Sequence, residues 1–164
     1  MLLYLLRHGI AEDHGSRSSD AERELTEEGV VKTRAILAAI EQMKFFSPEL
    51  VISSPLIRAR QTAKIALESF AKGAKFEISE VLRSESEVTD TMSLVAGHAK
   101  DFNRIMLVGH EPHLSRFGSA LLGSPVSVIE MKKAAVAKFE INRIDVPRMR
   151  GHLIALFPPK IGSI

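Results

Sequence analysis

The chain has 164 residues, which suits one domain over residues 1–164 with enough sequence to bury a core. A formal net charge of +2 is too weak to indicate a nucleic-acid-binding protein, and the absence of cysteine excludes disulfides and thiolate sites. No apolar run approaches the roughly 20 residues of a membrane span, so we expect no contact with a membrane. The absence of cysteine fits a reducing cytoplasm. We expect a cytoplasmic monomer that does not bind nucleic acid.

The first element is an apolar run that ends abruptly in polar residues. Leu3–Leu6 reads as a short buried strand, and Arg7, His8 and Gly9 follow it directly. Residues 12–24 (EDHGSRSSDAERE) are polar and predict an exposed loop. The strand is therefore expected to deliver two polar side chains at its end.

A helix is expected to begin near Thr26, which can cap it. Gly29 falls in its first turn and should cost about 1 kcal/mol relative to alanine. The residues that predict the inner face of this helix are Val30, Leu37, Ile40 and Met43, widened by Ala35, Ala38 and Ala39.

Strands and helices then alternate along the rest of the chain. The expected elements are a strand over Leu50–Ser53, a helix over Ile57–Ala71, a strand over Phe76–Ser79, a helix capped by Thr89 or Asp90 and ending near Ala99, a strand over Arg104–Val108, a helix from Pro112 to Gly123, and two strands over Ala135–Ile141 and His152–Phe157. This order predicts an α/β fold: a three-layer α/β/α sandwich with a mainly parallel sheet, mixed strands at the C-terminal end and no cap domain.

Ligands of such sheets bind beyond the carboxyl ends of the strands. Arg7 and His8 follow the first strand, Arg58 and Arg60 begin the helix after the second, and His110 follows the fourth. Arginine forks and helix N-termini favour a phosphate site, and an imidazole adds a nucleophile or proton donor. The alternative is that each is structural: a hydrogen-bonded histidine, or a solvated arginine on a helix.

Other catalytic motifs fit poorly. The HEPH segment lacks the spacing of a zinc peptidase motif. His8, His110 and His113 could form a metal trio, but no acidic ligand is clearly placed beside them. Phosphate-binding loops, dinucleotide fingerprints and nucleophile elbows are all missing from the sequence.

Three segments in order, YLLRHG, SSPLIRARQTA and LVGHEP, resemble the motifs of the histidine phosphatase superfamily, also called phosphoglycerate mutase-like. The second matches through Ser54, Leu56, Arg58, Ala59 and Thr62. The RHGIAE start, the VGHEPHLS segment and the chain length resemble the small phosphohistidine phosphatases of the SixA branch. That branch lacks an inserted cap, so the resemblance implies an open, shallow pocket.

The resemblance implies that His8 is the nucleophile and carries a phosphohistidine intermediate. Arg7 and Arg58 would bind the phosphoryl oxygens, and His110 would donate a hydrogen bond to them, with no cofactor or metal. We expect the other ring N–H of His8 to donate to a backbone carbonyl. The implied partner is a phosphorylated histidine-containing protein, either a phosphotransfer domain or a phosphocarrier in signal transduction.

Many relatives carry a carboxyl general acid beyond the third strand, where this chain reads VLRSESEVTD. Glu85 or Glu87 could serve, but both also read as solvated loop carboxylates; Glu12 and Glu111 are weaker candidates. Imidazole leaves more readily than an alkoxide, so a strong acid is expected to be dispensable. His113 reads as a substrate contact or a surface residue. The alternatives are a small-molecule phosphomonoester phosphatase and a non-catalytic phosphate-binding module.

Overall fold

The computed structural model describes residues 1–159, and its centre is a six-stranded sheet with the order β3-β2-β4-β1-β5-β6. The strands are β1 (Leu2–Arg7), β2 (Leu50–Ser53), β3 (Lys75–Ile78), β4 (Arg104–Gly109), β5 (Val136–Arg143) and β6 (Arg150–Phe157). The first four run parallel, and β5 and β6 extend the sheet antiparallel. The expected mainly parallel sheet is confirmed; residues 160–164 of the predicted domain lie outside the described residues.

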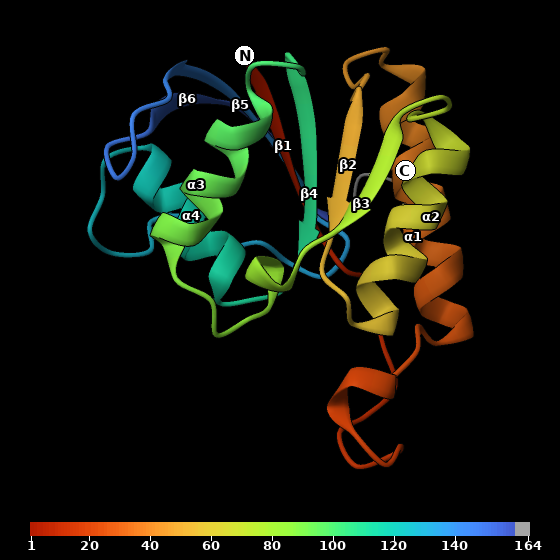
Figure 1. The fold of residues 1–164 in the computed structure, drawn as a ribbon. Coiled ribbons are helices and arrows are strands. Elements are labelled where there is room, and N and C mark those ends of the chain that lie inside the picture. The colour runs from red at the N-terminus through yellow and green to blue at the C-terminus, as the bar shows by residue number, and fades with distance from the viewer. Residues whose placement is uncertain (160–164) are drawn as a thin grey trace.

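Helices cover both faces of the sheet, which confirms the three-layer arrangement (Figure 1). α1 (Glu27–Gln42) and α2 (Ile57–Ser69) cover one face, and α3 (Val88–His98) and α4 (His113–Leu121) cover the other. Successive strand residues point to opposite faces, and β1 therefore contributes Leu3 and Leu5 to one core and Tyr4 and Leu6 to the other. No helix in the described part of the chain combines the length and apolar character that crossing a membrane requires.

The start of α1 is built against the chain that follows β1. The Thr26 hydroxyl accepts a hydrogen bond from the Gly29 amide at 3.0 Å, which confirms the predicted cap. A Cβ atom on Gly29 would lie 2.0 Å from the backbone oxygen of Ile10. Glycine is present in this turn because α1 approaches another backbone too closely for a side chain.

The predicted inner face of α1 is wrong at several positions. Thr33 and Ile36 are buried there with Leu37 and Ile40, whereas Met43 is 47% exposed. The expected alanines do not form the buried stripe: Ala35 and Ala38 are exposed, and Ala39 is only half-buried. Alanine is compatible with either face of a helix, so its presence does not locate the core.

Several other boundaries differ from expectation by a few residues, and two of these differences change the place of a named residue. α3 begins at Val88 after Glu87, so Thr89 and Asp90 lie inside its first turn and do not cap it. β6 begins at Arg150 and therefore includes Gly151, which was expected in the preceding loop.

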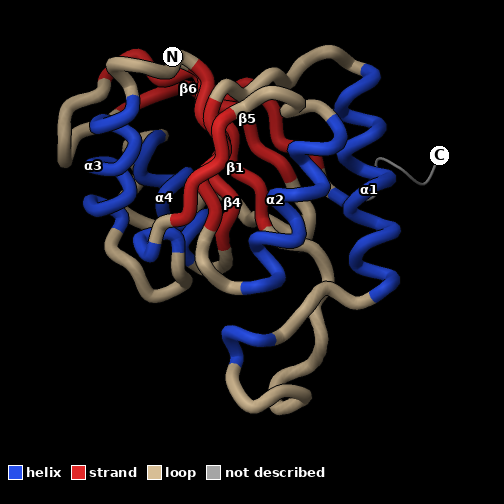
Figure 2. The backbone as a smooth tube through the Cα atoms, turned by 45° about the vertical axis from the view of Figure 1, so that its right-hand side comes forward, coloured by secondary structure: helices blue, strands red, loops and turns tan. Residues whose placement is uncertain are grey.

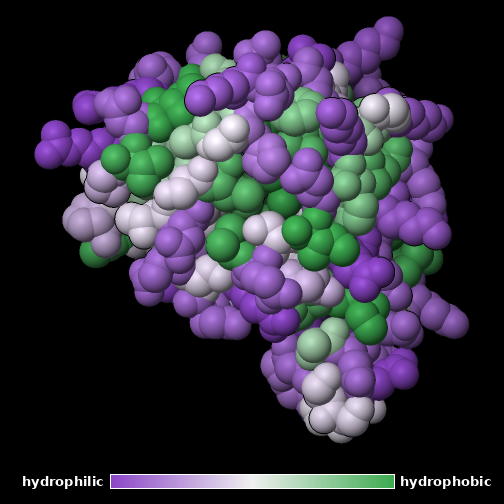
Figure 3. All heavy atoms as spheres, in the orientation of Figure 1, coloured by the Kyte–Doolittle hydropathy of each residue, from purple (hydrophilic) through white to green (hydrophobic). Residues whose placement is uncertain are grey.

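The segment between β1 and α1 projects beyond the carboxyl edge of the sheet (Figures 1 and 2). It contains one short 3-10 turn, Asp20–Glu22, and otherwise irregular backbone. On the face drawn in Figure 3, this projection is largely hydrophilic, as its polar sequence predicts. No described segment forms a helical cap over the edge, in agreement with the expected capless fold.

Candidate active site

Four predicted site residues, from three separate segments, line one pocket. Arg7 and His8 come from the end of β1, Arg58 from the first turn of α2, and His110 from the residue after β4. The pocket has a volume of about 510 Å³ and lies at the carboxyl edge of the sheet. The parallel pairing of β1 with β4 and of β4 with β2 brings these segments together.

His8 is buried and held by one ring nitrogen. Its Nδ1 lies 2.7 Å from the backbone oxygen of Gly9, and because that oxygen can only accept, Nδ1 carries the proton. The predicted hydrogen bond to a backbone carbonyl is therefore confirmed. No described residue hydrogen-bonds Nε2, so the lone pair of that nitrogen is available. Burial, with a contribution from nearby His110, lowers the pKa of His8 to about 2.

His110 faces His8 across the pocket, with 4.9 Å between the two ring centroids. Its Nε2 lies 2.8 Å from the Ser54 hydroxyl, whereas its Nδ1 is buried without a hydrogen-bond partner among the described residues. Burial, followed by the positive charge of Arg58, lowers the pKa of His110 to about 3. In the neutral ring one nitrogen accepts and the other donates. A Ser54 hydroxyl that donates to Nε2 would leave the proton on Nδ1.

The two arginines are anchored in a similar way. Arg7 donates from Nη1 to the Met131 carbonyl at 2.8 Å, and Arg58 donates from Nη1 to the Asp20 carbonyl at 2.7 Å. The Nε atom of each is buried and finds no acceptor in the described chain. Each guanidinium is therefore anchored by contacts that use only some of its five N–H donors, and the others have no acceptor in the described chain.

The turn after His8 is locked to α2 and α1. The Gly9 amide donates to the Thr62 hydroxyl at 3.1 Å, and that hydroxyl donates to the Arg58 carbonyl at 2.8 Å. A Cβ atom on Gly9 would lie 2.3 Å from the Thr33 hydroxyl oxygen. The turn thus couples the position of His8 to that of Arg58, and it requires glycine for the close approach.

Four further residues that the sequence singled out lie outside the pocket. His113 is fully buried, and its Nε2 lies 2.7 Å from the Thr91 hydroxyl. It is neither a substrate contact nor a surface residue, because α4 turns it into the core. Arg60 is exposed as expected, and Glu85 and Glu87 are exposed outside the pocket lining.

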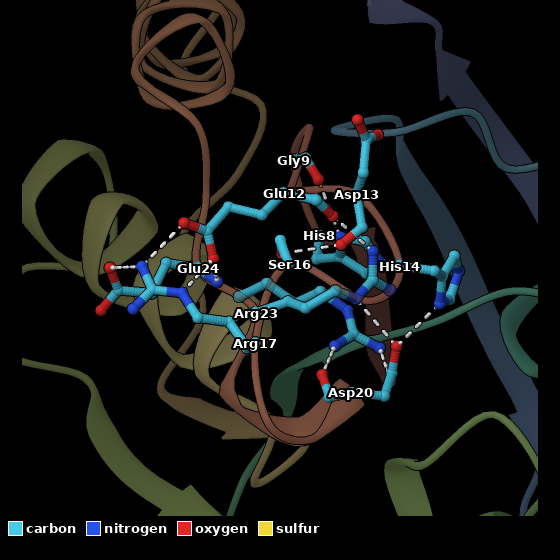
Figure 4. Close-up of polar contacts among 11 residues, drawn as sticks. His8, Gly9, Glu12, Asp13, His14, Ser16, Arg17, Asp20, Arg23 and Glu24 are labelled. Atoms are coloured by element: carbon cyan, nitrogen blue, oxygen red, sulfur yellow. Dashed lines mark hydrogen bonds and ion pairs between the residues drawn. The ribbon is translucent and has the colours of Figure 1, made fainter.

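Sequence reasoning missed the contribution of the polar loop to the pocket (Figure 4). The loop contributes Glu12, which the sequence offers only as a weaker general-acid candidate, and also Asp13, His14, Asp20 and Arg23, which it offers for no role. Their spacing shows no regular pattern, so the signal available in the sequence was only their charge.

Glu111 also lines the pocket, next to His110. Its Oε1 accepts a hydrogen bond from the Ser115 amide at 3.1 Å, and burial raises the pKa of this carboxyl. Of the four carboxyl candidates for a general acid, only Glu111 combines a place in the pocket with a raised pKa. Glu12 is also in the lining, but hydrogen bonds from Arg17 lower its pKa to about 2.

The model of the histidine phosphatase superfamily (branch 1) matches residues 3–88. The chain belongs to the histidine phosphatase superfamily. An uncharacterized protein of Picosynechococcus sp. is 31% identical over 98% of both chains. Members of this superfamily are phosphatases, which supports a hydrolase acting on phosphoryl groups.

Solved structures share the fold across nearly the whole length. The protein histidine phosphatase SixA complexed with tungstate superposes with a TM-score of 0.84 at 20% identity, covering 97% of each chain. A mycobacterial glucosyl-3-phosphoglycerate phosphatase complexed with VO3 gives a TM-score of 0.71 at 21% identity, covering 96% of this chain and 99% of the other. The neighbours thus include a protein phosphatase and a small-molecule phosphatase on one fold.

Proposed function

We propose that this protein is a protein phosphohistidine phosphatase that works through a phosphohistidine intermediate on His8. The observation that carries the proposal is the convergence of two arginines and two histidines on one pocket. Arg7 and Arg58 each keep N–H donors without a protein acceptor, His110 keeps a ring nitrogen without a partner, and His8 keeps an unprotonated Nε2. Three donors and one nucleophile match a phosphoryl group, which has several acceptor oxygens and an electrophilic phosphorus.

In the proposed reaction, Nε2 of His8 attacks phosphorus in line with the leaving group. The P–N bond to the substrate imidazole breaks, the imidazole takes up a proton from solvent water, and a P–N bond forms on His8. Water then attacks phosphorus, inorganic phosphate leaves, and His8 is restored. Arg7, Arg58 and His110 stabilise the negative charge on the phosphoryl oxygens, and the cationic side chains fill the role of a metal ion.

A protein substrate is supported by the form of the pocket. No described helical segment covers the carboxyl edge, so a phosphorylated histidine on the surface of a folded partner could reach His8. The similarity to SixA in complex with tungstate supports both the oxyanion site and this substrate class. The partner would be a histidine phosphotransfer domain or a phosphocarrier.

A small phosphomonoester is the second candidate, and Glu111 is the observation that favours it. An alkoxide leaving group needs a proton, and burial raises the pKa of this carboxyl in the pocket lining. The mycobacterial neighbour, whose name describes a glucosyl-3-phosphoglycerate phosphatase, supports the same possibility.

The test compares turnover of a phosphohistidine protein with turnover of a panel of alkyl phosphates, with and without a metal chelator. We expect a kcat/KM at least about a hundredfold higher on the phosphohistidine protein, because imidazole is the better leaving group. We expect no effect of the chelator, because the arginines fill the role of a metal ion. The Glu111→Gln variant should lose activity on alkyl phosphates while keeping it on phosphohistidine. Equal efficiency on both substrate classes would contradict the proposed preference.

A further inference from the structure

Asp20 connects the projecting loop to Arg58, which it contacts twice. Arg58 donates from Nη1 to the Asp20 carbonyl at 2.7 Å and from Nη2 to the Oδ2 atom at 2.9 Å. The Arg58 side chain is buried while the Asp20 side chain is about half exposed, so the pair lies at the boundary between the pocket and solvent. Asp20 therefore determines where the end of this guanidinium lies.

Asp20 is itself held by its neighbours in the loop (Figure 4). Its Oδ1 atom accepts from Nε of Arg23 at 2.8 Å and lies 3.2 Å from Nδ1 of His14. Arg23 is buried and also donates from Nη1 to the Glu12 carbonyl at 2.6 Å. The carboxylate is thus fixed by contacts that do not involve Arg58.

A second set of contacts closes the base of the loop. Arg17 binds both carboxylate oxygens of Glu12, at 2.8 and 2.7 Å, and lies 3.3 Å from Glu24. The Glu24 amide donates to Glu12 at 3.0 Å, and the Glu12 amide donates to the Glu24 carbonyl at 2.9 Å. These bonds fix the base of the loop and therefore restrict the positions that Asp20 can adopt.

We propose that Asp20 is a positioning residue: it holds the guanidinium of Arg58 at the pocket so that the N–H donors not used by Asp20 can bind a phosphoryl oxygen. A planar guanidinium offers several donors in a fixed geometry, and two of its nitrogens are taken by Asp20. Nη1 and Nη2 each carry a second N–H, and no described residue accepts a hydrogen bond from either of these. This inference rests on the proposed function, because it takes the pocket to be an oxyanion site.

A competing role for Asp20 is a carboxylate that occupies Arg58 until substrate displaces it. Two observations favour positioning. One of the two contacts uses the backbone carbonyl, which cannot swing away alone, and Arg23 would still hold the carboxylate after Arg58 released it. The two roles predict opposite results, because loss of a competing negative charge strengthens anion binding, whereas loss of a positioning contact weakens it.

The experiment measures the Kd for tungstate by titration calorimetry in the wild type, Asp20→Ala, Asp20→Asn and Asp13→Asn. Asp13 is the matched control, since it lines the same pocket while no hydrogen bond involves its carboxylate in the described chain. We expect Asp20→Ala to raise the Kd by about tenfold or more and Asp20→Asn to raise it less, because the amide keeps an acceptor oxygen. Asp13→Asn should lower the Kd, because it removes a negative charge from the pocket lining without removing a contact to Arg58.

A double-mutant cycle with Arg58→Ala separates positioning from general support of the fold. If Asp20 acts through Arg58, adding Asp20→Ala to Arg58→Ala should change the Kd by less than about twofold. A Kd for Asp20→Ala equal to or below that of the wild type, or fully additive effects in the cycle, would overturn the inference. A wild type that binds no tungstate would instead overturn the oxyanion site of the proposed function, and this inference with it.

Discussion

At the scale of single residues, the two imidazoles of the pocket are kept neutral by burial. The pKa of His8 is lowered to about 2 and that of His110 to about 3. A neutral His8 has an unprotonated Nε2 at every pH near neutrality, which a nucleophile requires. The acidic limb of the kcat/KM profile above pH 5 should therefore arise from groups other than these two histidines.

The same burial makes stability depend on pH. In the unfolded chain both histidines take up protons near the ordinary value of about 6.5, whereas the folded protein does not protonate them until the pH is far lower. The free energy of unfolding should thus have its highest value above about pH 7 and should decrease as the pH drops below 6.5. The slope is at most about 1.4 kcal/mol per pH unit for each histidine. Urea unfolding at pH 7.5, 6.5 and 5.5 measures it.

The control compares a buried histidine with an exposed one. A His110→Asn variant should show a smaller loss of stability between pH 7.5 and 5.5 than the wild type. A His152→Asn variant, which alters an exposed side chain, should show the same loss as the wild type. Wild-type stability that stays constant over this range would contradict the neutral state of the pocket histidines.

At the scale of elements, the first turn of α1 is shaped by what it packs against. Gly29 lies against the Ile10 backbone, and the Thr26 amide also donates to the Ile10 carbonyl at 3.0 Å. This contact fixes the chain just after the turn that follows His8. The helix propensity lost at Gly29 is therefore offset by a packing arrangement that no larger residue permits.

Replacing Gly29 by alanine should destabilise the fold despite the better helix propensity of alanine. The new Cβ would lie 2.0 Å from a backbone oxygen, so the two segments must separate, at a net cost of about 1–3 kcal/mol. Gly97→Ala in α3 is the matched control, because nothing lies within 4 Å of its Cβ position. It should stabilise the protein by about 0.5–1 kcal/mol in urea unfolding. A stabilised Gly29→Ala variant would contradict the packing.

The positions of helices and strands along the chain could be predicted better than the side that each of them buries. Short apolar runs such as Leu50–Ser53 become buried strands because both faces of a covered parallel sheet exclude water. The buried face of α1 depends on which neighbouring helix it meets, and alanines supply no direction for that choice. β3 lies at the edge of the sheet with every residue exposed, which its sequence does not distinguish from a buried strand.

At the scale of the whole molecule, the topology explains why the four site residues could be predicted together. Parallel strands bring their carboxyl ends to one edge, so polar residues that follow separate strands meet there. Asp20 could not be predicted in the same way. It lies 38 positions from Arg58 in an irregular loop, and only the folded path of that loop brings the two together.

The most direct measurement of the central claim is mass spectrometry of the wild type and of His8→Ala after each has been mixed with a phosphorylated phosphotransfer protein. We predict an acid-labile phosphoryl group on the wild-type peptide that contains His8, and none anywhere on the variant, because Nε2 of His8 is the attacking atom. A phosphoryl group on a different residue, or a His8→Ala variant that hydrolyses the phosphoprotein at the wild-type rate, would contradict it.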